Sequence, residues 1–121
     1  MNDERDDLRR RTKMFALRII KLFAALPRST EAQVLGKQLL RSGTSVGANY
    51  REAYRARSEL EFAAKIGDCL KEIEESLYWL ELLCESGIMP AERVAYLQDE
   101  ANQLTAIFVT ILKKARHNTR K

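Results

Sequence analysis

The chain has 121 residues, 45% of them hydrophobic and 31% charged, and this composition fits one globular domain with no room for a second. Two prolines and five glycines are too few for the many tight turns of an all-β fold, so long helices are favoured. The net charge is only +4, no apolar run approaches the roughly 18 residues of a membrane span, and the charged start MNDERDDLRRR lacks the apolar stretch of a secretory signal, so we expect a cytoplasmic protein without membrane association.

The first segment with helical spacing covers about residues 8–26. Apolar residues recur there at three- and four-residue steps, and Ile20 and Phe23 widen the apolar stripe. Pro27 ends the helix, because proline cannot continue the hydrogen-bond ladder. The residues expected to face the core are Leu8, Phe15, Ile19, Leu22 and Leu26.

The second predicted helix covers about residues 30–57. Ser29 or Thr30 can cap it, because a hydroxyl oxygen at this position accepts a hydrogen bond from an otherwise unpaired backbone N–H. Its apolar stripe consists of Leu35, Leu39, Val46 and Ala53.

The third and fourth predicted helices cover about residues 59–86 and 90–116. Ser58 caps the third, with Glu61 at the capping-box position, and Gly87 ends it. The apolar stripes are Phe62, Ile66, Cys69, Ile73, Leu77, Leu80 and Cys84, then Val94, Leu97, Ala101, Leu104, Phe108, Ile111 and Ala115. Short connections return each helix beside the previous one, so residues 1–121 are predicted to form one all-α domain, an up-down-up-down antiparallel four-helix bundle with a basic tail at 117–121.

The stretch GTSVG, centred on Ser45, matches the G-x-S-x-G signature of serine hydrolases. That chemistry needs a strand before the serine, a sharp turn at it and a histidine beside it. Ser45 instead lies inside a helical pattern, and the single histidine, His117, lies near the chain end. Cys69 and Cys84 are 15 residues apart in one helix, roughly 22 Å along its axis, which is too far for a disulfide. We therefore expect no enzyme activity, no metal site and no cofactor.

Two faces of the second helix are unusual. Gly36, Gly43 and Gly47 fall within roughly 40° of one another, which predicts a close approach either by another helix of the same chain or by another subunit. Arg41, Ser45, Asn49 and Glu52 form a polar stripe that either sets the register against a neighbouring helix or is simply a solvated face.

The polar stripe belongs to a longer spaced pattern that continues into Glu61-Phe62 and KEIEESLYWLELL, which contains Glu72, Glu75 and Trp79. With these residues the chain resembles the family of four-helix bundle proteins named for 23S ribosomal RNA intervening sequences, most strongly from Leu39 to Leu83. The resemblance implies a small bacterial bundle that assembles as a homopentamer, and some members are encoded inside insertions of the ribosomal RNA gene. A related bundle is a basic, nucleic-acid-binding accessory subunit of a retroelement reverse transcriptase. The terminal HNTRK lies outside the family pattern.

Charge is unevenly distributed along the chain. Residues 1–57 carry 13 Lys or Arg against 6 Asp or Glu, residues 58–112 carry 3 against 11, and residues 113–121 carry 5 against none. The basic stripe of the second helix and the acidic stripe of the third could pair with each other, within one protomer or between neighbours; they consist of Lys37, Arg41, Arg51 and Arg55 and of Asp68, Glu72 and Glu75.

The predicted topology also collects basic residues at one end of the bundle. Nine of them form the candidate nucleic-acid-binding set, with Arg120 and Lys121 beyond: Arg9, Arg10, Arg11, Arg51, Arg55, Arg57, Lys113, Lys114 and Arg116. No base-reading module occurs, so this set predicts binding of the RNA or DNA backbone by charge. The alternative is a protein-interaction scaffold whose charges serve self-assembly or an acidic protein partner.

Overall fold

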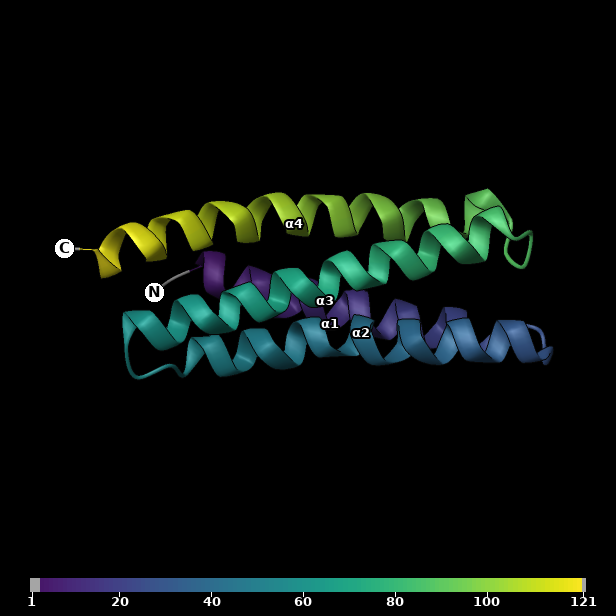
Figure 1. Ribbon diagram of the computed structural model, residues 1–121, viewed down its shortest axis with the longest axis horizontal. Helices are drawn as coiled ribbons and strands as arrows, with labels where there is room; N and C mark the ends of the chain where they lie inside the picture. Colours follow the sequence, from purple (N-terminus) through teal and green to yellow (C-terminus); the bar gives the residue numbers. More distant parts are fainter. Residues whose placement is uncertain (1–2, 121) are drawn as a thin grey trace.

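The computed structural model describes residues 3–120, which form four antiparallel helices packed side by side (Figure 1). The helices are α1 (Asp3–Ala24), α2 (Thr30–Tyr54), α3 (Glu59–Glu85) and α4 (Ala91–Thr119). Figure 1 shows the start of α1, the α2–α3 connection and the end of α4 at one end of the bundle, with the other two connections at the opposite end. The predicted all-α, up-down-up-down topology is confirmed.

Local chemistry explains where the helices begin and end. The Ser29 hydroxyl oxygen accepts a hydrogen bond from the Ala32 backbone N–H, and that of Ser58 accepts one from the Glu61 N–H, at 3.3 and 3.0 Å. Gly87 follows α3 with a φ of +80°, a left-handed conformation that favours glycine. The capping residues predicted from the sequence are thus the ones that cap α2 and α3.

Two helices are longer than predicted. α1 begins at Asp3 rather than near residue 8, and the acidic residues Glu4 and Asp6 close to its start suit the positive end of the helix dipole. α4 continues to Thr119, so residues 117–119 of the predicted tail are helical and Arg120 caps the helix. Arg116 and His117 lie in its last turn, where positive charge is favourable, and no glycine or proline stops it earlier. Lys121 lies outside the described residues.

The apolar stripes meet in one core that runs along the bundle. The five residues predicted to face the core from the first helix are buried, although Leu26 lies beyond the end of α1. Leu39, Val46, Ile66, Ile73, Leu80, Leu104 and Phe108 are buried as well. Ile20 was predicted to widen the core stripe of α1, and that prediction is wrong, since 46% of its surface is exposed. Ile20 lies on the outward face of α1. None of the helices described between residues 3 and 120 is both long and apolar enough to cross a membrane.

The glycine face of α2 packs against α1 of the same chain. A Cβ atom built on Gly43 would lie 2.8 Å from Ile19 Cγ1, and one on Gly47 would lie 3.3 Å from Thr12 Oγ1. At Gly36 the added atom would press on Leu26 and come within 2.9 Å of Phe23 Cδ1. Of the two alternatives open from the sequence, the structure therefore shows packing within one chain.

The opposite side of α2 contacts α3 through two buried polar links. The hydroxyls of Ser42 and Ser76 are hydrogen-bonded at 2.8 Å, and both residues are fully buried. The Cys69 thiol points at the Val46 carbonyl oxygen, 3.6 Å away. Burial also raises the pKa of this thiol to about 12, which keeps it protonated at neutral pH. These links favour one register of α3 along α2, since a shift would break the bond between the helices and leave each hydroxyl only its own backbone acceptor, the carbonyl of Leu39 or of Glu72.

The close α1–α2 contact predicts opposite effects for two Gly→Ala changes. Gly43→Ala gains up to about 1 kcal/mol of helix propensity but forces a methyl into the β-branched Ile19, an overpacking cost of about 1–3 kcal/mol. We expect a net loss of about 1 kcal/mol in the free energy of unfolding. Gly67→Ala in α3 meets no atom within 4 Å and should stabilise by about 0.5–1 kcal/mol. Urea unfolding measures both, and equal effects of the two changes would contradict the packing argument.

Candidate nucleic-acid interface

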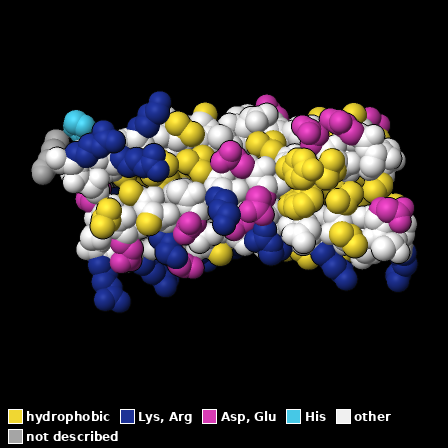
Figure 2. Space-filling model, in the orientation of Figure 1, with side chains coloured by type: hydrophobic (Ala, Val, Ile, Leu, Met, Phe, Trp, Pro, Cys, Tyr) yellow, Lys and Arg dark blue, Asp and Glu magenta, His cyan; other side chains and the backbone are white. Residues whose placement is uncertain are grey.

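The end of the bundle that carries the α2–α3 connection is rich in exposed cations. Lys and Arg side chains gather around it in the space-filling view (Figure 2). They come from the last turn of α2 and its connection to α3, and from the last turns of α4. We call the following six residues the basic end surface: Arg51, Arg55, Arg57, Lys113, Lys114 and Arg116.

The side chains of the basic end surface are free to meet an external anion. All six residues are exposed, and none of them forms an ion pair with a carboxylate of the described residues. Arg51 and Arg116 also lie where the dipoles of α2 and α4 are negative, which stabilises their charge in the folded protein.

Two of the three arginines predicted from α1 are already paired with carboxylates. Arg11 donates to both Glu100 carboxylate oxygens, at 3.1 and 2.9 Å, and also to Gln103 Oε1 at 3.0 Å. The hydrogen bond to Glu100 raises the pKa of Arg11 further above its already high value. Arg10 pairs with Asp7 at 2.5 Å. Arg11 therefore links α1 to α4, and we leave it out of the basic end surface.

An aromatic side chain lies beside the basic end surface. The guanidinium carbons of Arg5 and Arg9 lie 5.3 and 5.6 Å from the centre of the Tyr54 ring, within cation–π range, and Tyr54 is 38% exposed. Arg9, the third arginine predicted from α1, is thus directed at this ring. Sequence reasoning missed this role of Tyr54. The i, i+4 spacing of Tyr50 and Tyr54 at the end of a basic helix was the available signal.

Tyr50 holds the helices together beneath this surface. It is buried, its ring meets Phe108 of α4 edge-on at 5.8 Å, and its hydroxyl donates to the Arg5 carbonyl oxygen of α1 at 3.4 Å. A groove of about 420 Å³ opens above it between the ends of the helices, with Tyr54, Phe62 and Lys114 among its walls. Burial raises the pKa of Tyr50 to about 12.

Carboxylates at the same end reduce its net charge. Glu59 and Glu61 lie in the first turn of α3 and are exposed, and Asp7 faces Arg10. Glu59 and Glu61 therefore offset part of the positive charge of the basic end surface beside the α2–α3 connection, and the last turns of α4 contain no carboxylate.

The polar stripe of α2 lies along α3 in the same protomer. Arg41 pairs with Glu72 at 3.2 Å and with Glu75 at 2.5 Å, and Glu52 pairs with Lys65 at 2.6 Å. Ser45 and Asn49 instead donate to the α2 backbone, to the carbonyls of Arg41 and Ser45. The ends of the stripe therefore match α3 in register, while its middle residues bond within their own helix.

Trp79 follows Glu75 by one turn and is half-buried, with its ring 5.1 Å from that of Tyr78. Its indole N–H is buried without a hydrogen-bond partner among the described residues.

The rest of the basic stripe of α2 does not pair with the acidic stripe of α3. Lys37, Arg51 and Arg55 form no ion pair with a described carboxylate.

The GTSVG segment has the helical geometry predicted for it. Ser45 lies in the middle of α2 with its hydroxyl bonded to the Arg41 carbonyl oxygen at 2.7 Å, and His117 lies in the last turn of α4. No group of His, Cys, Asp and Glu among residues 3–120 has the arrangement of a metal site.

The protein is thus an up-and-down four-helix bundle, and comparison with known proteins shows which family of such bundles it belongs to. The model of the 23S rRNA-intervening sequence protein family matches residues 5–110. The chain is also similar to a crystal structure of a protein of unknown function from the S23 ribosomal protein family of Bacteroides thetaiotaomicron. The TM-score is 0.84 at 35% identity, over 90% of this chain and 97% of that one. No curated protein matches the chain. The chain belongs to the 23S rRNA-intervening sequence protein family.

The raised pKa of Tyr50 predicts how stability changes in alkali. The phenol ionises near pH 10 in the unfolded chain and near pH 12 in the folded one, so the unfolded state loses its proton first. The contribution of Tyr50 to stability is therefore intact below about pH 10 and is lost as the pH rises towards about 12. Tyr50→Phe should unfold less steeply with pH across this window in urea titrations. Tyr78→Phe, at an exposed site, should keep the wild-type slope, and identical slopes for all three proteins would contradict the assignment.

Proposed function

We propose that the protein is a non-enzymatic, cytoplasmic homo-oligomer that binds the backbone of RNA or DNA through its basic end surface. The observation that carries the proposal is the set of six exposed cations at one end of the bundle, none of them paired with a carboxylate of residues 3–120. The family's description, which refers to an intervening sequence of 23S rRNA, supports a nucleic-acid partner.

The chemistry of this surface favours phosphates over bases. Arginine and lysine side chains neutralise backbone phosphates and release bound counterions, a contribution that does not depend on sequence. Tyr54 adds an exposed ring beside two arginines, on which an unpaired base can stack. We therefore propose a preference for single-stranded or looped nucleic acid with little base selectivity.

Removing charge at the basic end should weaken binding more than removing it elsewhere. The variant Lys113→Gln, Lys114→Gln, Arg116→Gln keeps the buried Leu112 and Ala115 of α4, so the bundle should remain folded. Affinity for a single-stranded RNA should fall, and the slope of log K against log salt should flatten by about 0.7 for each phosphate that the variant no longer neutralises. A matched control, Arg28→Gln, Lys37→Gln, Lys71→Gln, removes equal charge from exposed positions elsewhere and should do much less.

Three results would decide against this surface. Equal weakening by the two triple variants would mean that the protein is merely basic. Unchanged binding by the first variant would mean that the site lies elsewhere. Absence of RNA and DNA binding by the unmodified protein at low salt would favour the second candidate function, a protein-interaction scaffold.

A row of exposed apolar side chains on α1 supports self-association. Met14, Leu17 and Ile20 follow one another at three-residue steps and are 41%, 48% and 46% exposed. The glycine face of α2 and the Arg41 pairs are used within the protomer, so they leave α1 as the better candidate for contact with another copy. The family resemblance gives the pentamer as the proposed number of subunits.

Charge placed in this row should disrupt the oligomer. Leu17→Glu with Ile20→Glu leaves the α1 core residues untouched and puts two carboxylates where apolar contact is proposed. Sedimentation should show the unmodified protein as an oligomer and the variant as a smaller species with the same helical content. Leu60→Glu, at a 73% exposed position on α3, is the control and should assemble normally. A monomeric unmodified protein at micromolar concentration would refute self-association.

A further inference from the structure

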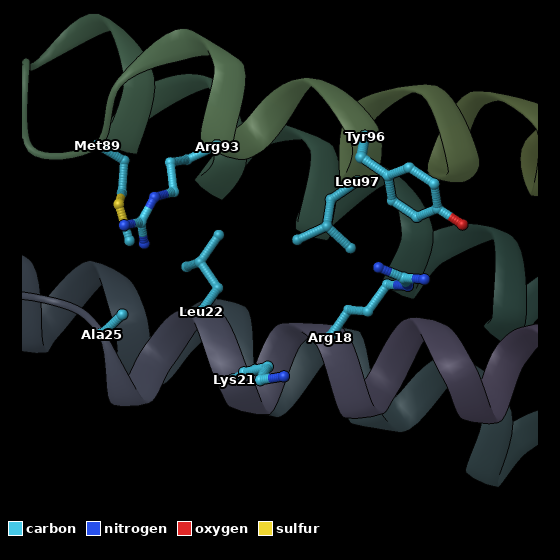
Figure 3. Close-up of a pocket in the computed structure, with 8 residues that line it drawn as sticks. All are labelled: Arg18, Lys21, Leu22, Ala25, Met89, Arg93, Tyr96 and Leu97. Carbon is cyan, nitrogen blue, oxygen red and sulfur yellow. The ribbon is translucent and has the colours of Figure 1, made fainter.

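A second positively charged hollow lies between α1 and α4, towards the end of the bundle opposite the basic end surface (Figure 3). It has a volume of about 390 Å³. Leu22, Met89 and Leu97 form an apolar floor, and Arg18, Lys21 and Arg93 supply its charge. In Figure 3 the Arg93 side chain extends from α4 towards α1 and that of Arg18 extends from α1 towards α4, with the two leucines between them.

The register of α1 against α4 makes this charge unusual. Arg11 lies seven residues before Arg18 in α1, and it forms an ion pair with Glu100 of α4. Seven residues correspond to about two helical turns, so a strict repeat of this pair would match Arg18 with residue 93, whereas the Arg18 side chain lies over Tyr96. Residue 93 is an arginine where the repeat would need an acid.

The three cations of this hollow have no counter-charge within the described part of the chain. No acidic residue lines the hollow, and none of the three forms an ion pair with a described carboxylate. Arg18 instead lies over the Tyr96 ring, with its guanidinium carbon 4.3 Å from the ring centre, which fixes its direction. Like charges around one hollow repel each other, and an anion bound between them removes that repulsion.

We propose that this hollow is a binding site for a small amphiphilic oxyanion, an aliphatic carboxylate or phosphate ester. In Figure 3 the guanidinium of Arg93 lies beside Met89 and that of Arg18 beside Tyr96, at opposite ends of the hollow. The head group therefore lies against Arg93, because one guanidinium can bind two carboxylate or phosphate oxygens at once. The hydrocarbon part covers Leu22, Met89 and Leu97. The volume lies near the lower limit for small-molecule sites, which favours a short chain. This site is separate from the basic end surface and does not depend on nucleic-acid binding.

Met89 provides a local probe of the hollow in the intact protein. Its side chain is buried in the floor, whereas Met14 is exposed on the outer face of α1. Protein labelled with ¹³C at the methionine methyls is titrated with octanoate and with octyl phosphate, and the Met89 signal should shift saturably while that of Met14 does not. The stronger of the two ligands identifies the head group. Octanol and acetate each lack one half of the proposed chemistry and should leave Met89 nearly unchanged.

Two charge variants and a salt series complete the test. Arg93→Gln should weaken octanoate binding by roughly threefold to fivefold, as expected for a partly exposed charge pair, and Arg18→Gln should weaken it less, while Arg28→Gln should not weaken it. If a variant fails to fold, a salt titration of the unmodified protein takes its place, and added salt should weaken octanoate binding. The proposal is overturned if neither anion shifts Met89, if octanol shifts it equally, or if Arg28→Gln weakens octanoate binding as much as Arg93→Gln.

Discussion

The close approach of α1 to α2 is the contact on which the rest of the bundle depends. Three glycines bring the helices so near that Ile19 and Thr12 occupy the space where side chains of α2 would be. α2 is therefore fixed on both sides, by shape against α1 and by the buried Ser42–Ser76 hydrogen bond against α3. The position of its last turn, with Arg51 and Arg55, follows from these two contacts.

Much of the fold could be predicted from the sequence because its signals are local. Apolar spacing identifies four helices, and Ser29, Ser58 and Gly87 mark boundaries through hydrogen bonds or a backbone conformation that involve only neighbouring residues. Pairings between distant helices could not be predicted in the same way. Arg11 and Glu100 are 89 positions apart, and no local pattern states that they meet. Ser42 and Ser76 are buried although serine usually lies at the surface.

The candidate surfaces also combine features that the sequence predicts with features that only the structure shows. The topology alone predicts that the ends of α2 and α4 lie together, and it therefore places the six residues of the basic end surface at one end of the bundle. It could not separate them from Arg10 and Arg11, whose carboxylate partners are visible only in three dimensions. The hollow around Arg18 and Arg93 has no signature in the sequence, since neither residue is unusual until the register of α1 against α4 is known. Charge segregation along the chain thus has two results, pairing along α2 and α3 and exposed cations towards both ends.

The order of the contacts has a consequence for how the chain folds. α1 packs on α2, α2 on α3 and α3 on α4, while α1 and α4 meet along a much thinner seam. Most native contacts therefore join helices that are neighbours in the sequence, an arrangement associated with rapid folding. The α1–α4 seam alone must close a loop that includes nearly the whole chain, so its formation carries the largest entropic cost. We expect the three hairpin contacts to form first and the ion pair of Arg11 with Glu100 to form when the bundle closes.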